Sequence, residues 1–418
     1  MQRAAAFGDA LRSTAMTEHT KRIPRWLNRT VLGIGLASLF SDWSHEIATT
    51  LLPTFLATMG VAAAWLGLIE GVSDGLSSFA KMTSGYYTDR LRRRKPIAVI
   101  GYLLTALGTA AFGLATNAWH VLLARAVAWL GRGVRTPVRK ALLAGAVTRE
   151  TYGRAFGFER MMDTLGAIIG PATAFLLLQL VNHDYERLFA LTLIPGLIAA
   201  ALIAIVVKEK ERPLVPHVSF GESLRALPAR FRRFLVAVGL FGMGDFAHTM
   251  LILLAMQQLT PVFGVAEAAS LAAGLYVLHN VLYAGFSMLA GWLADRFDKG
   301  RLLATGYFAA CIMALAVILL PANIWTLAAI FAIGGIYVAM EETLEDSFCA
   351  ELVDQAHHGI AFGTLATVNG AGDFASSLLV GLLWTTCGTS AAFGYSAVLF
   401  LCGGVMVLRA SSIRDVKV

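Results

Sequence analysis

The chain contains one stretch of sequence twice, and this repeat constrains its fold more than any other feature. The motif Gly-x-x-x-Asp-Arg starts at Gly85 and again at Gly291, and 291 − 85 = 206. Self-similarity at a fixed period is the signature of a duplicated structural unit. The sequence therefore predicts two homologous halves. The same shift of 206, without an insertion, superimposes further identical residues: Trp119 on Trp325, Gly153 on Gly359, and Gly166 on Gly372.

The composition is too apolar for a water-soluble protein. Apolar residues make up 57% of the 418 and charged residues only 15%, whereas soluble domains carry about 25% charged residues. A helix needs about 20 mainly apolar residues to span a bilayer. We therefore predict an all-α membrane protein with twelve transmembrane helices in two pseudo-symmetric six-helix bundles. The predicted spans are residues 30–56, 63–88, 96–115, 119–143, 155–181, 187–207, 232–258, 268–293, 301–320, 323–348, 358–385 and 390–410.

Basic residues indicate how these helices are oriented. Of the 34 Lys and Arg residues, only Arg187 falls in a predicted outside loop, and positive loops mark the cytoplasmic side. We therefore expect both termini in the cytoplasm of a bacterium, with the spans in its inner membrane. The net charge of +7 then reflects orientation and contact with anionic lipids rather than nucleic-acid binding.

The first 28 residues contain no continuous apolar core, so we expect a tail there rather than a removable signal. Charge and proline enrichment predicts a linker in water between the halves. The predicted divisions are a cytoplasmic tail (1–28), an N-terminal bundle (29–207), a cytoplasmic linker (208–229), a C-terminal bundle (230–410) and a second cytoplasmic tail (411–418).

The repeated motif resembles the signature between helices two and three of the major facilitator superfamily, Gly-x-x-x-Asp-Arg-x-Gly-Arg-Arg. Arg92 stands where the signature has glycine, and Asp298 holds that place in the second copy. The resemblance implies a transporter that works by alternating access. A carboxylate at a helix end can pair with nearby arginines and with the N-terminus of a facing helix, which gives a latch. The candidate latch residues are Gly85, Asp89, Arg90, Arg93, Arg94, Asp295 and Arg296.

The fifth predicted span carries Gly166, Gly170 and Pro171, in a pattern that resembles the antiporter signature of export branches of this superfamily. Ala174 and Phe175 replace the next expected glycine pair. Proline removes a backbone hydrogen bond and bends a helix. Small residues at this spacing also let two helices approach closely, so helix packing alone is an alternative explanation.

Ionisable residues at membrane depth are candidates for function because their burial in lipid is costly. On the first predicted span, Asp42 lies three residues from His45 and four from Glu46, which places all three on one stripe of a helix. Two nearby carboxylates in a low dielectric cannot easily both be charged. Asp42 and Glu46 are therefore our first candidates for proton coupling.

Five further residues are candidates for proton coupling or substrate binding. For the carboxylates among them, the alternative is a hydrogen bond between helices. Arg125 resembles the buried arginine of proton-coupled family members, and we expect it to balance the charge of Asp42 or Glu46, unless it is an ordinary arginine near the outer boundary. The five residues are Arg125, Asp163, Asp245, His248 and Asp373.

Charges of opposite sign occupy equivalent positions in the two halves. The differences 341 − 135, 345 − 139 and 346 − 140 all equal 206. Equivalent ends of parallel repeats face each other across a transporter, so we predict a charged inner gate. The alternative is that each set pairs within its own half. The facing sets are Arg132, Arg135, Arg139 and Lys140 against Glu341, Glu342, Glu345 and Asp346.

The leading hypothesis is a proton-coupled exporter of a small molecule that is driven by the proton gradient without a bound cofactor and acts as a monomer. A second hypothesis is a divalent metal exporter that resembles ferroportin and uses Asp42, His45, Asp245 and His248. A third is a transporter with an anionic cargo, and a fourth is a membrane scaffold or sensor that does not transport. An enzyme is not expected, because the sequence has no phosphate-binding glycine loop and no nucleophile with a base at fixed spacing.

Overall fold

The computed structural model describes residues 26–60, 63–182, 184–209 and 219–412. These residues are helical and contain no strand. Residues 1–25 and 413–418 of the predicted tails and residues 210–218 of the predicted linker lie outside the described residues. The first half contains α2 (Arg29–Thr58), α3 (Ala63–Thr88), α4 (Lys95–Ala110) with a 3-10 turn η1 (Ala111–Leu114), α5 (Ala118–Gly145), the turn η2 (Arg149–Thr151), α6 (Tyr152–Leu180), and α7 (Tyr185–Ala201) with a π-helical turn η3 (Leu202–Val206).

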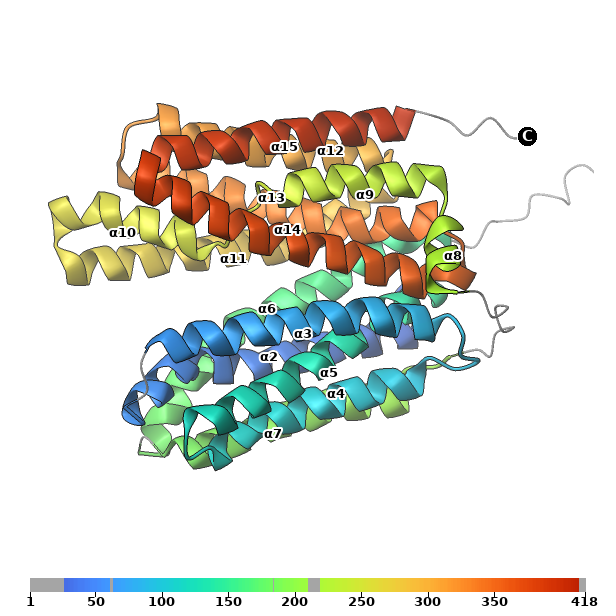
Figure 1. Ribbon diagram of the computed structural model, residues 1–418, viewed down its shortest axis with the longest axis horizontal. Coiled ribbons are helices and arrows are strands. Elements are labelled where there is room, and N and C mark those ends of the chain that lie inside the picture. The colour runs from blue at the N-terminus through green and yellow to red at the C-terminus, as the bar shows by residue number, and fades with distance from the viewer. Residues whose placement is uncertain (1–25, 61–62, 183, 210–218, 413–418) are drawn as a thin grey trace, which may run out of the picture.

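The second half repeats this order after a short helix outside the bundle, and Figure 1 shows the two halves as separate layers of long helices. Its elements are α8 (Phe220–Arg225), α9 (Ala229–Gly242), α10 (Thr249–Phe263), α11 (Val265–Ala294), α12 (Lys299–Leu319), α13 (Ile324–Leu352), the turn η4 (Gln355–His357), α14 (His358–Cys387) and α15 (Thr389–Ser412).

The twelve predicted spans all correspond to helical segments, which confirms the fold class. Seven segments are long and apolar enough to cross a membrane by length and composition alone. The other five are α2, α3, α5, α14 and the α9–α10 pair. Each of these carries charged residues along its length or is broken, and both features lower the apolar signal. The duplication extends to helix caps, because the side chains of Asn117 and Asn323, again 206 apart, cap α5 and α13.

The seventh span is not the single helix predicted for residues 232–258. Helix α9 ends at Gly242 and α10 begins at Thr249, so residues 243–248 are not helical. Glycine has a low helix propensity, and Gly244 lies tightly against Leu399 and Ser396, where a Cβ would be 2.9 Å and 3.1 Å from their atoms. The helix is therefore interrupted at the point where the backbone packs closely against α15.

The two halves meet mainly where α3 packs on α14 and α6 packs on α11. Glycines allow the contact: a Cβ built on Gly85 would collide with the carbonyl oxygen of Gly359, and one built on Gly291 would collide with that of Gly153. We call this end of the molecule the closed end. It is where α3 and α11 end and where α6 and α14 begin.

The halves separate away from the closed end. On α3, the Ser78 hydroxyl still lies 3.1 Å from the place where a Cβ of Gly370 would be. Further along the same face, a Cβ on Gly75 or Gly71 would meet no atom within 4 Å. In Figure 1 the ribbons of the two halves converge towards the end of α15 and diverge at the opposite end. The structure is therefore closed at one end and open at the other.

The glycine contacts predict that one methyl group shifts the conformation. Gly291→Ala should destabilise the closed end, because its Cβ would overlap the Gly153 carbonyl. Gly285→Ala on the same helix is the matched control, because a Cβ there meets nothing within 4 Å and alanine favours a helix by about 1 kcal/mol over glycine. Distances between spin labels on α6 and α11 should lengthen only in Gly291→Ala. Equal distance distributions in the two variants would contradict this prediction.

Candidate functional site

The Asp89 carboxylate joins the first half to the second at the closed end. It accepts hydrogen bonds from the backbone N–H groups of Gly359 and Ile360, each at 2.8 Å. Its second partner is Arg94, at 2.7 Å, and both side chains are only 5% exposed. The N-terminus of α14 carries a partial positive charge, so the carboxylate is neutralised from both sides. This geometry is the latch expected from the repeated motif.

A second latch occupies the symmetry-related position. Asp295 accepts hydrogen bonds from the backbone N–H groups of Gly153, at 2.7 Å, and Arg154, at 3.2 Å. The two aspartates are 295 − 89 = 206 positions apart in the sequence, and the two glycines that donate to them are 359 − 153 = 206 positions apart. The arginine differs in origin: Arg154 of the facing helix pairs with Asp295 at 2.6 Å, whereas Arg94 belongs to the same loop as Asp89.

The other candidate arginines of the motif stack on their own helices. The guanidinium of Arg90 lies 3.4 Å from the ring centre of Tyr86, and that of Arg296 lies 3.6 Å from the ring centre of Trp292. Arg93 is exposed at the closed end. These contacts keep the loop arginines close to the helix ends that carry the latches.

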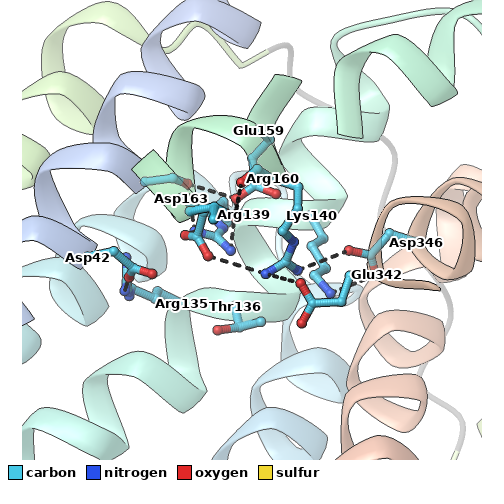
Figure 2. A network of polar contacts seen from close by, with 12 residues as sticks. Asp42, Arg135, Thr136, Arg139, Lys140, Glu159, Arg160, Asp163, Glu342 and Asp346 are labelled. Atoms are coloured by element: carbon cyan, nitrogen blue, oxygen red, sulfur yellow. Dashed lines mark hydrogen bonds and ion pairs between the residues drawn. The ribbon is translucent and has the colours of Figure 1, made fainter. Parts of the chain in front are cut away.

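A bridge of charges also connects the halves beside the latches. Arg160 of α6 lies 2.8 Å from Glu342 and 3.2 Å from Asp163. Lys140 of α5 lies 2.6 Å from Asp346, which is also 3.9 Å from Arg160. Figure 2 shows Arg160 between Asp163 of its own half and Glu342 of the other. We refer to these five residues as the inter-half bridge.

Of the three residue pairs predicted to form the gate, only one forms an ion pair within the described residues. Lys140 and Asp346 meet as expected, whereas Arg139 pairs inside its own half with Glu159 at 2.9 Å and Asp163 at 3.3 Å. Arg139 also donates to the Ser38 hydroxyl at 2.6 Å. The face of α5 that carries this arginine is turned towards α2 and α6, so it does not reach the second half.

Arg135 also differs from the predicted pairing with Glu341. It is 3.7 Å from Asp42 and lies over the ring of Tyr102. Glu341 is buried and makes no ion pair within the described part of the chain. Glu345 accepts hydrogen bonds from Tyr307 and Asn369 inside the second half. The alternative of pairing within each half therefore describes these residues.

Asp42 and Glu46 lie on the same face of α2 but in different surroundings. Asp42 is buried, 3.5 Å from Arg132 and 3.7 Å from Arg135. The Glu46 carboxylate is partly exposed and makes no hydrogen bond or ion pair among the described residues. The charges of Arg132 and Arg125 act on it electrostatically. Of the two acids, Glu46 is the one that can exchange a proton without first breaking an ion pair.

The small residues of α6 hold this helix against α2. A Cβ on Gly166 would collide with the Leu39 carbonyl oxygen, and one on Gly170 would collide with the Glu46 side chain. Helix α6 continues through Pro171. The glycines thus have a packing role, which is the alternative explanation that the sequence left open.

Arg125 pairs with a different acid from the one expected. It pairs with Glu70 of α3 at 2.8 Å and forms no ion pair with Asp42 or Glu46 among the described residues, and its guanidinium covers the ring of Trp129 at 3.6 Å. The ring of His45 approaches the same indole at 4.4 Å between centres. Glu70 provides the counter-charge and thus holds α3 to α5.

The candidates of the second half lie around the break in the seventh span. Asp245 accepts a hydrogen bond from the Tyr337 hydroxyl at 3.0 Å. His248 faces His279 of α11 with 4.9 Å between ring centres. Asp373 of α14 is exposed, and Lys81 of the first half interacts with it electrostatically. Asp373 therefore faces the first half across the region between the bundles.

The four proposed metal ligands do not form one cluster. Within the described residues, no group of three or more His, Cys, Asp or Glu side chains is arranged to hold a metal ion. His45 lies against Trp129, whereas His248 lies beside His279 in the other half. In this conformation the arrangement does not favour the divalent metal alternative.

Arg160 is the functional candidate that the sequence interpretation missed. It lies three residues after Gly157 and seven after Gly153, and both glycines contact α11. Residues at this spacing share one face of a helix. The periodicity of the matched glycines was therefore a usable signal that Arg160 points towards the second half.

Sequence and structure comparisons give concordant matches. Residues 34–276 and 234–416 match the sequence model of the Major Facilitator Superfamily. Over 384 residues the chain is 26% identical to an uncharacterised MFS-type transporter of Methanocaldococcus jannaschii, covering 92% of this chain and 95% of that protein. Over 125 residues it is 34% identical to the multidrug resistance protein MdtH of Photorhabdus laumondii, covering 29% of this chain and 30% of that protein.

A solved structure with the same fold is that of a bacterial homologue of the iron transporter ferroportin in an outward-facing state. The TM-score is 0.75 at 14% sequence identity, and the match covers 92% of this chain and 100% of that chain. At this identity the likeness shows the fold alone.

The pair of Lys140 and Asp346 predicts compensation by charge exchange. Lys140→Asp or Asp346→Lys alone should destabilise the closed end by about 3 kcal/mol, because each leaves a buried charge beside a like charge. The double exchange should recover most of this loss, as measured by spin-label distances across the closed end. The matched control is the exchange of Lys299 and Glu351, which pair at 2.6 Å within the second half and should leave those distances unchanged. Failure of the double exchange to recover any closure would contradict a role of this pair between the halves.

Proposed function

The chain belongs to the major facilitator superfamily of membrane transporters, and we propose that it exports a small molecule from a bacterial cytoplasm in exchange for protons. The observation that carries the proposal is that α5 links two sets of charged contacts, one with Asp42 of α2 and one that leads to the inter-half bridge. Asp42 holds the arginines of α5, Arg139 of the same helix holds Asp163, and Asp163 shares Arg160 with Glu342.

In this proposal the transporter alternates between the present state and one that is open at the closed end. The contacts between the halves that would have to break are the Asp89 and Asp295 latches and the inter-half bridge. We assign the closed end to the cytoplasm because the basic loop at residues 90–95 lies there. The present state is then open to the outside.

Proton coupling would act through α2. Uptake of a proton by Glu46 or Asp42 would remove a negative charge that faces Arg132 and Arg135. The arginines would then be held less firmly against α2, and α5 would be freer to move relative to α6. Because α5 and α6 also carry Lys140 and Arg160, this motion would weaken the bridge and favour opening to the cytoplasm.

Export rather than import is supported by the local likeness to multidrug resistance protein MdtH. The likeness to the ferroportin homologue carries no cargo to this chain, since at 14% identity it shows the fold alone and the four candidate metal ligands are not gathered within the described residues. A scaffold or sensor without transport would leave Glu46 without a role, and it would tolerate neutral substitutions there.

The proposal is tested in two steps with the purified full-length chain. A thermal-shift screen at pH 5.5 and 7.5 with organic cations, organic anions and divalent metal ions identifies a ligand, because a ligand that binds the folded state raises its stability. The best ligand is then offered to proteoliposomes with an imposed pH gradient. We expect uptake against its own gradient that stops when a protonophore collapses the pH gradient.

The variant for this assay is Glu46→Gln, which should reduce gradient-driven transport at least tenfold while leaving exchange of labelled for unlabelled ligand measurable. Glu267→Gln, at an exposed position in the first turn of α11, is the control and should transport normally. Transport that ignores the pH gradient would overturn proton coupling. Stabilisation by metal ions alone would favour the divalent metal exporter instead.

A further inference from the structure

A pocket of about 740 Å³ lies at the closed end on the outer side of the first half, away from the contact between the halves. It is formed by the start of α4, the π-helical turn η3 and the first residues of the linker. Helices α4 and α7 contact each other, and Figure 1 shows both along the side of the first half that faces away from the second. The proposed transport cycle gives this pocket no role.

One end of the pocket is positively charged. Arg93, Lys95, Lys208 and Glu209 contribute to its lining. Three of these residues are cations and one is an anion, which gives a formal charge of 3 − 1 = +2. The negative charge is already engaged, because Glu209 accepts hydrogen bonds from the backbone N–H groups of Arg94 and Lys95 at 2.7 to 2.9 Å.

Two further cations border the pocket besides Lys95. The ammonium group of Lys95 donates to the Val207 carbonyl at 2.8 Å, so it is tied to the linker. Arg93 and Lys208 are both exposed beside the pocket. Such a pair of cations at the closed end is complementary to a phosphate group.

The other wall of the pocket is apolar and continues along the membrane-spanning part of the two helices. Ile100 of α4 is 54% exposed and Ile205 of η3 is 71% exposed, and both line the pocket. Further along, Leu107 of α4 and Ile194 of α7 are 53% and 57% exposed. In a multi-pass membrane protein these side chains lie among lipid chains. The pocket therefore joins a basic rim to an apolar surface that extends into the bilayer.

We propose that this pocket binds one anionic phospholipid, with its phosphate beside Arg93 and Lys208 and an acyl chain along Ile100 and Ile205. A basic pocket between helices at the edge of the bilayer is the chemistry that recognises anionic lipid headgroups. The bound lipid would connect the linker to the loop that carries Arg94, which pairs with Asp89 of the first latch. Occupancy would then favour the closed end.

The test measures binding of dioleoylphosphatidylglycerol to the purified full-length chain by native mass spectrometry and by thermal shift. We expect this lipid to bind and to raise the melting temperature, whereas dioleoylphosphatidylcholine and inorganic phosphate should do neither. Equal binding of the two lipids would overturn the charge complementarity. Equal stabilisation by inorganic phosphate would assign the site to a soluble anion instead.

The variant Arg93→Gln with Lys208→Gln should weaken binding of the anionic lipid about thirtyfold, since each cation near the membrane surface contributes about a factor of five. Arg232→Gln with Arg233→Gln removes two exposed cations from the start of α9 and should bind normally. The charge-preserving variant Arg93→Lys with Lys208→Arg should also bind and shows that a loss is not due to misfolding. Equal affinity of the glutamine variant and the α9 control would overturn the proposal.

A second variant tests the apolar part. Ala204→Trp places a large side chain in the pocket at an exposed position of η3 and should exclude the acyl chain while leaving the cations unchanged. We expect it to weaken binding of the anionic lipid at least tenfold. Unchanged binding of this variant would overturn the placement of the acyl chain and leave only a surface attraction to the headgroup.

Discussion

The closed contact between the halves depends on a carboxylate that accepts hydrogen bonds from the first backbone N–H groups of a helix in the opposite half. Asp89 and Asp295 each make this contact, and each is possible only because glycines at the crossing let two helices approach to backbone contact. Such N–H groups have no partner within their own helix, so the carboxylate satisfies donors that otherwise require water. The interaction is strong when the halves are together and is fully replaceable by solvent when they part, as a reversible closure requires.

The charges inside the first half extend this closure inwards. Arg139 gathers Ser38, Glu159 and Asp163 from α2 and α6 around one guanidinium. Because a buried charge without a counter-charge is costly, a change in the charge of one of these residues alters the electrostatic energy of the others. Arg160 extends this coupling to the second half through its ion pair with Glu342. The arrangement couples the interior of one bundle to the interface between the two.

Much of the architecture was predictable from the sequence, because the spacing of 206 fixes which residues are equivalent and apolar length fixes the spans. The partners of Asp89 and Asp295 followed from helix-end electrostatics. The pairing of Arg135 and Arg139 did not, because equivalence between halves says nothing about the rotation of each helix about its axis. The break at residues 243–248 was hidden as well, since it arises from contact with α15, a tertiary effect that overrides an apolar pattern.

That break gives the second half a joint which the first half does not have. Helix α10 packs chiefly against α11 rather than against the rest of its bundle, and residues 243–248, which lie between the two helices, connect it to α9. Figure 1 shows α10 and α11 extending together as an arm at the end opposite the closed contacts. A rotation confined to this joint would change the direction of α10 relative to α9, so that α10 can move at the end opposite the closed contacts without tilting a whole bundle.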